Sequence, residues 1–186
     1  GVVFLKQLEA STGRSIFDLF DMFIGTSAGG MNALLVAIER MSAKELHEFW
    51  ARENILSSMS MSWENKTSFL HTRPKYDGIG KTEILKKYLA EATIGDAQKP
   101  VITLSYDVEN RKPRLLSSMH TPDIKAVSAA MATSAAPIYY PTAELEDGTW
   151  HIDGGIVSNN PSLIGYVEGM KYFDTNKVKV LSIGTV

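Results

Sequence analysis

Ser27 has the sequence surroundings of a nucleophilic serine. It lies in the segment Gly25-Thr26-Ser27-Ala28-Gly29, which fits the pattern G-x-S-x-G. Apolar residues precede this segment and others at helical spacing follow it, which predicts a sharp turn between a strand and a helix. A serine on such a turn points its hydroxyl outward, and the helix start supplies N–H groups that stabilise negative charge. The alternative is a packing turn in which Ser27 has no chemical role.

A nucleophilic serine needs a base. The chain has four histidines: His47, His71, His120 and His151. Of these, only His151 lies beside another unusual motif. That motif is Asp153-Gly154-Gly155, which follows a predicted strand over 149–152. The two glycines would leave the Asp153 carboxylate open to a neighbouring loop, and a carboxylate shielded from water is a stronger base. Taken alone, the motif is more typical of a turn.

The elements around these motifs alternate between strands and helices. Apolar runs predict further strands over 21–24, 100–106, 114–117 and 179–183. Helical spacing or capping residues predict helices that follow Gly29, begin at Ser42, cover 81–92 and begin at Thr121. Residues 55–80 lack periodicity and are expected to form a long irregular excursion. The alternation predicts an α/β fold with a mostly parallel sheet, in a single domain over 1–186.

Composition excludes several kinds of chemistry. The 186 residues include no cysteine, which removes disulfides, thiolate nucleophiles and zinc–thiolate sites and fits a reducing, cytoplasmic location. The formal net charge of -2 gives no reason to expect nucleic acid as a partner. No apolar run approaches the roughly 18 residues of a membrane-spanning helix. We expect neither a cofactor nor a metal ion.

The two motifs in this order resemble the patatin-like phospholipase family, which includes plant patatins and calcium-independent phospholipases A2. The downstream motif continues as D-G-G-x-x-x-N-x-P through Asn159 and Pro161. Residues 101–113, 130–137 and 181–185 are similar to further segments of that family, so the resemblance covers nearly the whole chain. It implies a three-layer α/β/α fold with a mostly parallel central sheet.

For the site, the resemblance implies a catalytic dyad without histidine. Ser27 would be the nucleophile, and Asp153 the base that takes its proton and later activates water to release an acyl-enzyme. His151 would at most support the site. The nucleophile elbow would comprise Gly25, Thr26, Ala28 and Gly29, and the Asp-Gly-Gly motif would add Gly154 and Gly155.

One part of the family pattern is missing. The family has a glycine-rich loop, D-G-G-G-x-[RK]-G, before its first helix, and this loop supplies oxyanion donors. The opening residues Gly1-Val2-Val3-Phe4-Leu5 resemble the last glycine of that loop and the start of the helix. We therefore expect the loop and the first strand upstream, and a domain truncated at both ends. The Ala28 N–H would supply one donor.

The resemblance implies a lipid acyl hydrolase, a serine hydrolase of the phospholipase A or esterase type whose substrate is a lipid or phospholipid. A set of apolar and basic residues in the excursion suits either an adaptable lid at a lipid interface or an ordinary loop. They are Met59, Met61, Trp63, Lys66, Phe69, Leu70 and Arg73. Because the net charge is small, membrane attachment would be weak and peripheral.

Two other hypotheses stay open at this stage. In the first, the chain is an ordinary α/β-hydrolase in which Asp107 and His151 serve Ser27, since serine, acid and histidine occur in the required order. In the second, the chain is a non-catalytic module that binds lipid. The first predicts that activity depends on His151, and the second predicts lipid association that is indifferent to Ser27.

Overall fold

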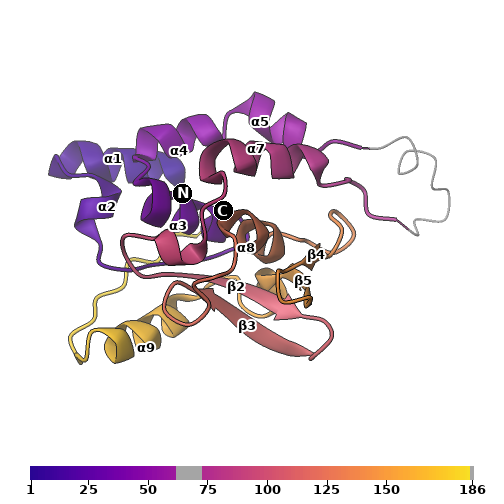
Figure 1. The fold of residues 1–186 in the computed structure, drawn as a ribbon. Coiled ribbons are helices and arrows are strands. Elements are labelled where there is room, and N and C mark those ends of the chain that lie inside the picture. The colour runs from indigo at the N-terminus through magenta and orange to yellow at the C-terminus, as the bar shows by residue number, and fades with distance from the viewer. Residues whose placement is uncertain (62–72, 185–186) are drawn as a thin grey trace.

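The computed structural model describes residues 1–61 and 73–184 and has a five-stranded sheet at its centre (Figure 1). The strands are β1 (Phe23–Thr26), β2 (Val101–Asp107), β3 (Lys112–Ser117), β4 (Ala143–Glu144) and β5 (Trp150–Asp153). Along one edge of β2, residues 101–104 pair with β1 and residues 105–107 pair with β5. Its other edge pairs with β3, and β4 pairs with β5. The end of β1 and the end of β5 therefore meet beside the middle of β2.

The sheet is mixed, which corrects the expected mostly parallel arrangement. Among the described residues only β1 and β2 run parallel, while the β2–β3, β2–β5 and β4–β5 pairs are antiparallel. For the β2–β3 and β4–β5 pairs the reason is local: residues 108–111 and 145–149 are short connections, and a short connection between paired strands forms a hairpin. The α/β class itself is confirmed.

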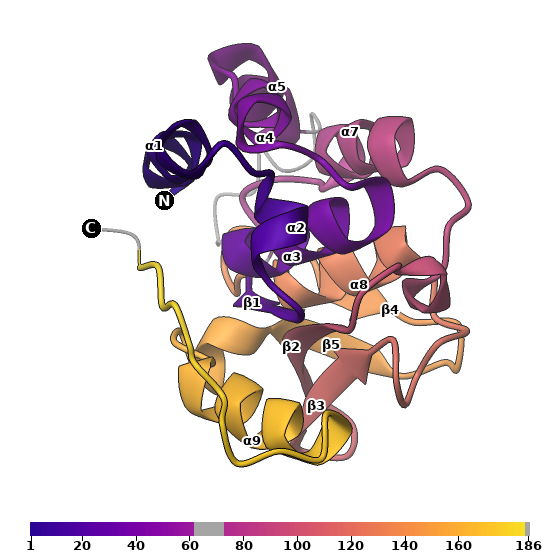
Figure 2. The same cartoon turned by 90° about the vertical axis from the view of Figure 1, so that its left-hand side faces the viewer.

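Helices cover both faces of the sheet (Figures 1 and 2). On one face lie α3 (Ala28–Glu39) and α8 (Ala126–Thr133), and on the other lies α9 (Ser162–Tyr172). Beyond α3 and α8 stands a further group of helices: α1 (Val2–Thr12), α2 (Ile16–Leu19), α4 (Ala43–Phe49), α5 (Arg52–Ser58) and α7 (Ile79–Leu89). Short 3-10 turns occur at Ile94–Asp96 and Gly154–Ile156.

The core explains why α3 and α8 sit against the sheet. Leu34, Leu35 and Ala37 of α3 are fully buried, as are Val101 and Ile102 of β2. The α8 helix contributes mainly alanines, and side chains this small let its backbone approach β2 closely. Its last turn thereby comes next to the strand ends that carry the two motifs.

Several expected boundaries are confirmed and others are wrong. Ser42 and Glu45 form the predicted capping box. The helix expected from Thr121 starts only at Ala126, because the backbones of Ile124 and Ala126 are hydrogen-bonded to residues 92–94. Residues 55–58, expected to be irregular, complete α5. Residues 179–183 are not a strand, since no strand of the described residues lies alongside them to pair with.

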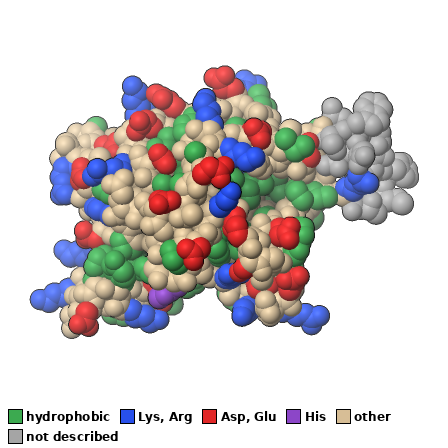
Figure 3. Space-filling model, in the orientation of Figure 1, with side chains coloured by type: hydrophobic (Ala, Val, Ile, Leu, Met, Phe, Trp, Pro, Cys, Tyr) green, Lys and Arg blue, Asp and Glu red, His purple; other side chains and the backbone are tan. Residues whose placement is uncertain are grey.

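Charges on the visible surface are mixed. In Figure 3 acidic and basic side chains are interspersed, with apolar areas between them. None of the helices in the described part of the chain has the length and apolar character needed to cross a bilayer.

Candidate active site

Ser27 occupies a strained turn between β1 and α3. Its φ of 55° and ψ of -123° lie outside the regions that non-glycine residues normally adopt. The turn is so tight that a Cβ on Gly25 would lie 2.1 Å from the carbonyl oxygen of Gly29, and one on Gly30 would lie 2.8 Å from Thr133. Gly29 has open space around its α-carbon. Packing therefore requires glycine at positions 25 and 30 and not at 29.

The structure brings Ser27 together with Asp153. The Ser27 hydroxyl donates to Oδ2 of Asp153 at 2.7 Å, across a sequence separation of 126 residues. Asp153 is the last residue of β5 and only 6% exposed, and its Oδ1 accepts from the Gly155 N–H at 2.6 Å. A Cβ on Gly154 would lie 2.2 Å from the carbonyl oxygen of Leu104. The glycines of this motif thus let the backbone turn close to β2 while one carboxylate oxygen faces Ser27.

The C-terminal end of α8 supports both residues. Thr133 Oγ1 accepts from the Ser27 N–H at 3.1 Å and donates to the carbonyl of Leu104. Two positions on, the carbonyl of Ala135 accepts from the Asp153 N–H at 3.0 Å. The sequence predicted a helix in this segment and a resemblance to a family segment, but it did not single out Thr133. A hydroxyl among alanines in a buried helix was the available signal.

An apolar pocket opens beside Ser27, with a volume of about 180 Å³. Its walls come from α3, α4, α5, α7 and the segment after α8, and include Ala28, Met31, Phe49, Trp50, Ile84 and Tyr140. A serine hydroxyl bonded to a buried carboxylate at the edge of an apolar pocket is suited to attack on an ester of an apolar acid.

Comparison with known proteins identifies the family of the chain. Residues 1–164 match the sequence profile of the family described as patatin-like phospholipase. The chain belongs to the patatin-like phospholipase family. The match includes the strand–serine–helix turn and the Asp-Gly-Gly motif, and membership supports a lipid hydrolase.

Similar patatin-like proteins come from bacteria and plants. A cGAMP-activated phospholipase of Pseudomonas aeruginosa is 32% identical over 191 residues, covering 98% of this chain and 57% of that protein. One of Escherichia coli is 35% identical over 186 residues, covering 92% and 52%. Patatin-like protein 4 of Arabidopsis thaliana is 28% identical over 211 residues, covering 97% and 53%. The chain spans about half the length of these curated relatives.

A solved structure supports the fold. The crystal structure of VipD from Legionella pneumophila matches with a TM-score of 0.51 at 14% identity, over 84% of this chain and 44% of VipD. At this identity the likeness concerns the fold alone.

Lys81 is an unexpected member of the pocket beside Ser27. It lies on α7, is 5% exposed, and lines the same pocket as Ser27. Burial lowers the pKa of Lys81 to about 8, and the nearby negative charge of Asp153 opposes that shift. The motifs of the sequence did not point to Lys81. The signal was a lysine in line with Leu85 and Leu89, at the four-residue spacing of a buried helix face.

The structure does not bring Asp107, His151 and Ser27 together as a catalytic triad. The His151 ring lies 2.9 Å from the Ser105 hydroxyl through Nδ1 and 2.8 Å from the Thr149 hydroxyl through Nε2. The Asp107 carboxylate accepts from Asn110 and from the Glu109 N–H. Burial, helped by the charge of Arg114, lowers the pKa of His151, so the ring is neutral near pH 7. No hydrogen bond in the described part of the chain joins His151 to Ser27.

The other histidines lie elsewhere. His47 is exposed near the end of α4, and His120 lies 3.9 Å from Glu168. His71 falls outside the described residues, as do four members of the expected lid: Trp63, Lys66, Phe69 and Leu70. Met59 and Met61 are described and are 40% and 42% exposed. They follow Ser58, which lines the pocket, but neither of the two is among the lining residues.

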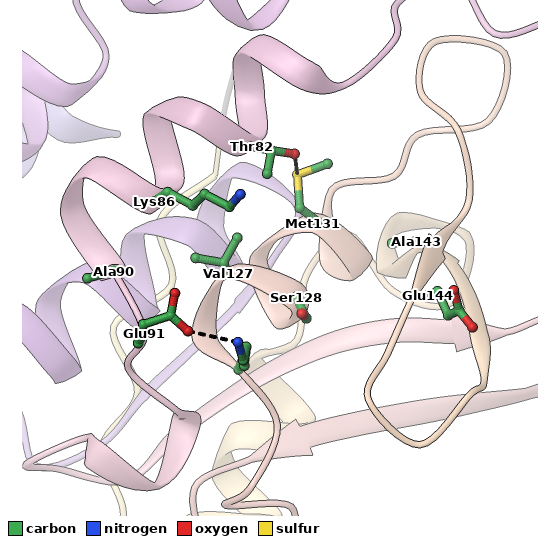
Figure 4. Close-up of a pocket in the computed structure, with 10 residues that line it drawn as sticks. Thr82, Lys86, Ala90, Glu91, Val127, Ser128, Met131, Ala143 and Glu144 are labelled. Carbon is green, nitrogen blue, oxygen red and sulfur yellow. Dashed lines mark hydrogen bonds and ion pairs between the residues drawn. The ribbon is translucent and has the colours of Figure 1, made fainter.

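A second hollow, of about 290 Å³, lies between α7, α8 and β4 (Figure 4). Its lining mixes both signs of charge, and Lys125 pairs with Glu91 across it at 2.8 Å. Neither Ser27 nor Asp153 lines it. Although this hollow is larger, the chemistry of the pocket beside Ser27 makes that pocket the candidate active site.

Proposed function

We propose that this chain is a lipid acyl hydrolase of the phospholipase A or esterase type, with Ser27 as nucleophile and Asp153 as base. The observation that carries the proposal is the 2.7 Å hydrogen bond from the Ser27 hydroxyl to the buried Asp153 carboxylate. Membership of the patatin-like phospholipase family supports the lipid substrate. The arrangement requires no third residue, because Asp153 is already oriented by the Gly155 N–H.

Acylation would begin when Ser27 Oγ attacks the ester carbonyl carbon and its proton passes to Oδ2 of Asp153. The tetrahedral intermediate then collapses, the bond to the alcohol oxygen breaks, and Asp153 returns the proton to the leaving alkoxide. In deacylation, water attacks the acyl-serine and gives its proton to Asp153. Fatty acid leaves as Ser27 recovers that proton. General-base assistance of this kind contributes about 10²–10⁴-fold in rate.

The start of α3 would stabilise the oxyanion. Ala28 is the first residue of α3, so its N–H has no acceptor within the helix, and it adjoins Ser27 at the pocket. Each such donor contributes about 2.7–4 kcal/mol to transition-state stabilisation. Further donors would come from the glycine-rich loop that the family has before its first helix.

The pocket suggests how lipid is held. Its volume of about 180 Å³ is below the roughly 300–1,000 Å³ of common ligand sites, so it would take only part of an acyl chain. The remainder would lie outside the pocket, against the exposed Met59 and Met61 that follow the pocket-lining Ser58 in the chain. We propose peripheral contact with a membrane there, and a cytoplasmic location, which the absence of cysteine supports.

Esterase assays test this function. We would measure hydrolysis of a short-chain nitrophenyl ester and a fluorogenic phospholipid, with Ser27→Ala, Asp153→Asn and the exposed control Asp174→Asn. Ser27→Ala and Asp153→Asn should lose at least about 10³-fold in kcat while Asp174→Asn keeps it. Labelling by a fluorophosphonate should require Ser27. A folded chain without labelling or turnover, whose vesicle binding is the same with Ser27→Ala, would establish the non-catalytic lipid-binding module instead.

A nucleotide activator is a second element of the proposal. Two relatives named cGAMP-activated phospholipases are 32% and 35% identical and match over more than nine-tenths of this chain. We expect cGAMP to raise the rate of phospholipid hydrolysis by the full chain. Titration of cGAMP against that rate, with cyclic mononucleotides as controls, would show this, and an unchanged rate would argue against it.

A further inference from the structure

We propose that Lys81 is a positioning residue for Ser27 and Asp153, and that it acts through the C-terminal end of α8. The inference rests on the proposed function, because it concerns how the pair is held for catalysis. It assigns a role to Lys81, which among the described residues is the one lysine that lines the pocket beside Ser27.

The Lys81 ammonium makes two hydrogen bonds and one cation–π contact. It donates to the carbonyl oxygen of Ser134 at 2.8 Å and to the Ser134 hydroxyl at 3.0 Å. Its nitrogen also lies 3.6 Å from the centre of the Tyr140 ring, a cation–π contact. No hydrogen bond between described residues joins Lys81 directly to Ser27 or Asp153. Any influence on the pair through contacts must therefore pass through its neighbours.

Ser134 is the link between Lys81 and the pair. It stands between Thr133, which accepts from the Ser27 N–H, and Ala135, whose carbonyl accepts from the Asp153 N–H. Three consecutive residues thus bind Ser27, Lys81 and Asp153. Because neighbouring residues share rigid peptide planes, holding Ser134 also restrains the two groups that orient Ser27 and Asp153.

The C-terminal end of α8 explains why a charged side chain is buried at position 81. The carbonyl groups at the end of a helix carry partial negative charge and favour a cation. Burial of an ammonium group is costly, and it is the main cause of the lowered pKa of Lys81. An apolar residue would fill the pocket wall without that cost, but it could not bind the Ser134 carbonyl. The retained charge is therefore explained by the bonds it makes.

A contact with an anionic lipid headgroup is the competing role for Lys81. The geometry disfavours it, because Lys81 is only 5% exposed, two of its three N–H groups already donate to Ser134, and the Tyr140 ring lies against the ammonium. The two roles differ in their dependence on substrate. Positioning affects every ester equally, whereas headgroup binding affects only substrates that carry a phosphate.

The test compares Lys81→Met with Lys87→Met, an exposed lysine on the same helix. The substrates are a neutral nitrophenyl butyrate and fluorogenic phosphatidylcholine and phosphatidylglycerol. For Lys81→Met we expect kcat to fall roughly 10–100-fold on all three, the loss that a misplacement of about 1 Å causes, with KM within about twofold. Fluorophosphonate labelling should slow by the same factor, and Lys87→Met should match the parent.

The pH profile supplies a second readout. The titratable groups that face Lys81 are the Asp153 carboxylate and the Tyr140 phenol, and the Tyr76 ring packs at a tilt against Tyr140. We expect kcat of the parent to fall as pH rises through about 8, where Lys81 loses its proton. In Lys81→Met, kcat should not show this fall above pH 8.

Other outcomes would overturn the inference. A loss confined to the two phospholipids, with a raised KM, would make Lys81 a headgroup ligand. Unchanged kcat on all substrates would leave it with a packing role only. If Lys81→Met does not fold, as judged by thermal melting, Ser134→Ala tests the same link and should lower kcat several-fold on all substrates. Activity that survives Ser27→Ala would instead refute the proposed function.

Discussion

The Ser27 N–H donates to the Thr133 hydroxyl at 3.1 Å, so a backbone group of the strained turn is held by a side chain from α8. Thr133 also donates to the Leu104 carbonyl and is completely buried. A strained conformation persists only where its surroundings over-determine it. The Thr133 hydroxyl is one of the contacts that do so here.

Thr133→Val should therefore weaken both stability and the site. Valine has nearly the same shape but cannot accept from Ser27 or donate to Leu104, so two buried backbone groups lose a partner. We expect the free energy of unfolding to fall by about 1–3 kcal/mol. We also expect kcat to fall about tenfold or more, because the nucleophile is less well fixed. Denaturant unfolding and nitrophenyl ester hydrolysis measure the two effects, and Thr133→Ser, which keeps the hydroxyl, should recover most of the activity.

Two glycines of the turn should respond oppositely to alanine. Gly25→Ala would bring a Cβ to 2.1 Å from the Gly29 carbonyl oxygen, so the free energy of unfolding should fall by about 1–3 kcal/mol or more. Gly29→Ala meets no atom within 4 Å and lies in the first turn of α3, so it should be neutral or stabilise by up to about 1 kcal/mol. Thermal and urea unfolding decide this. Equal stability of the two variants would show that the turn is looser than described.

His151 should matter for stability at low pH and not for turnover. Because burial lowers its pKa below the ordinary 6.5, the unfolded chain takes up a proton before the folded chain as pH falls. Stability from this group is thus complete above pH 6.5 and is lost as pH drops through the folded-state pKa. His151→Gln should flatten that dependence in urea unfolding from pH 7.5 to 5. At pH 7.5 the folded variant should keep kcat within a few-fold of the parent. Loss of all activity would instead support the hypothesis of a triad that includes His151.

Lys81 should make stability rise with pH as well, but in a higher pH range. Its pKa is lowered to about 8 in the folded chain from an ordinary value of 10.5, so between these values the unfolded chain binds more protons. The free energy of unfolding of the parent, relative to Lys81→Met, should rise across that range with a slope of at most about 1.4 kcal/mol per pH unit. Stability would rise while activity falls. A flat difference between the two proteins would mean that Lys81 is less buried than described.

The sequence by itself determined the local elements around the site and named its two central residues. Apolar spacing located β1, α3 and β2 to within a few residues, because the periods of helices and strands are properties of a short segment. The glycines around Ser27 indicated a tight turn, and the Ser42–Glu45 capping box was readable for the same reason. The motifs and their resemblance to a family singled out Ser27 and Asp153.

Tertiary structure alone decided what those residues contact. The 2.7 Å approach of Ser27 to Asp153 spans 126 residues, and no local pattern encodes such a distance. The directions of the strands, the failure of residues 179–183 to pair, and the roles of Thr133 and Lys81 likewise depend on which segments the fold places side by side. A lysine on a helix reads as a surface residue until the packing of α7 against α8 buries it beside Ser134. The physical reason is that hydrogen bonds and burial depend on several segments coming together, whereas periodicity is a property of a single segment.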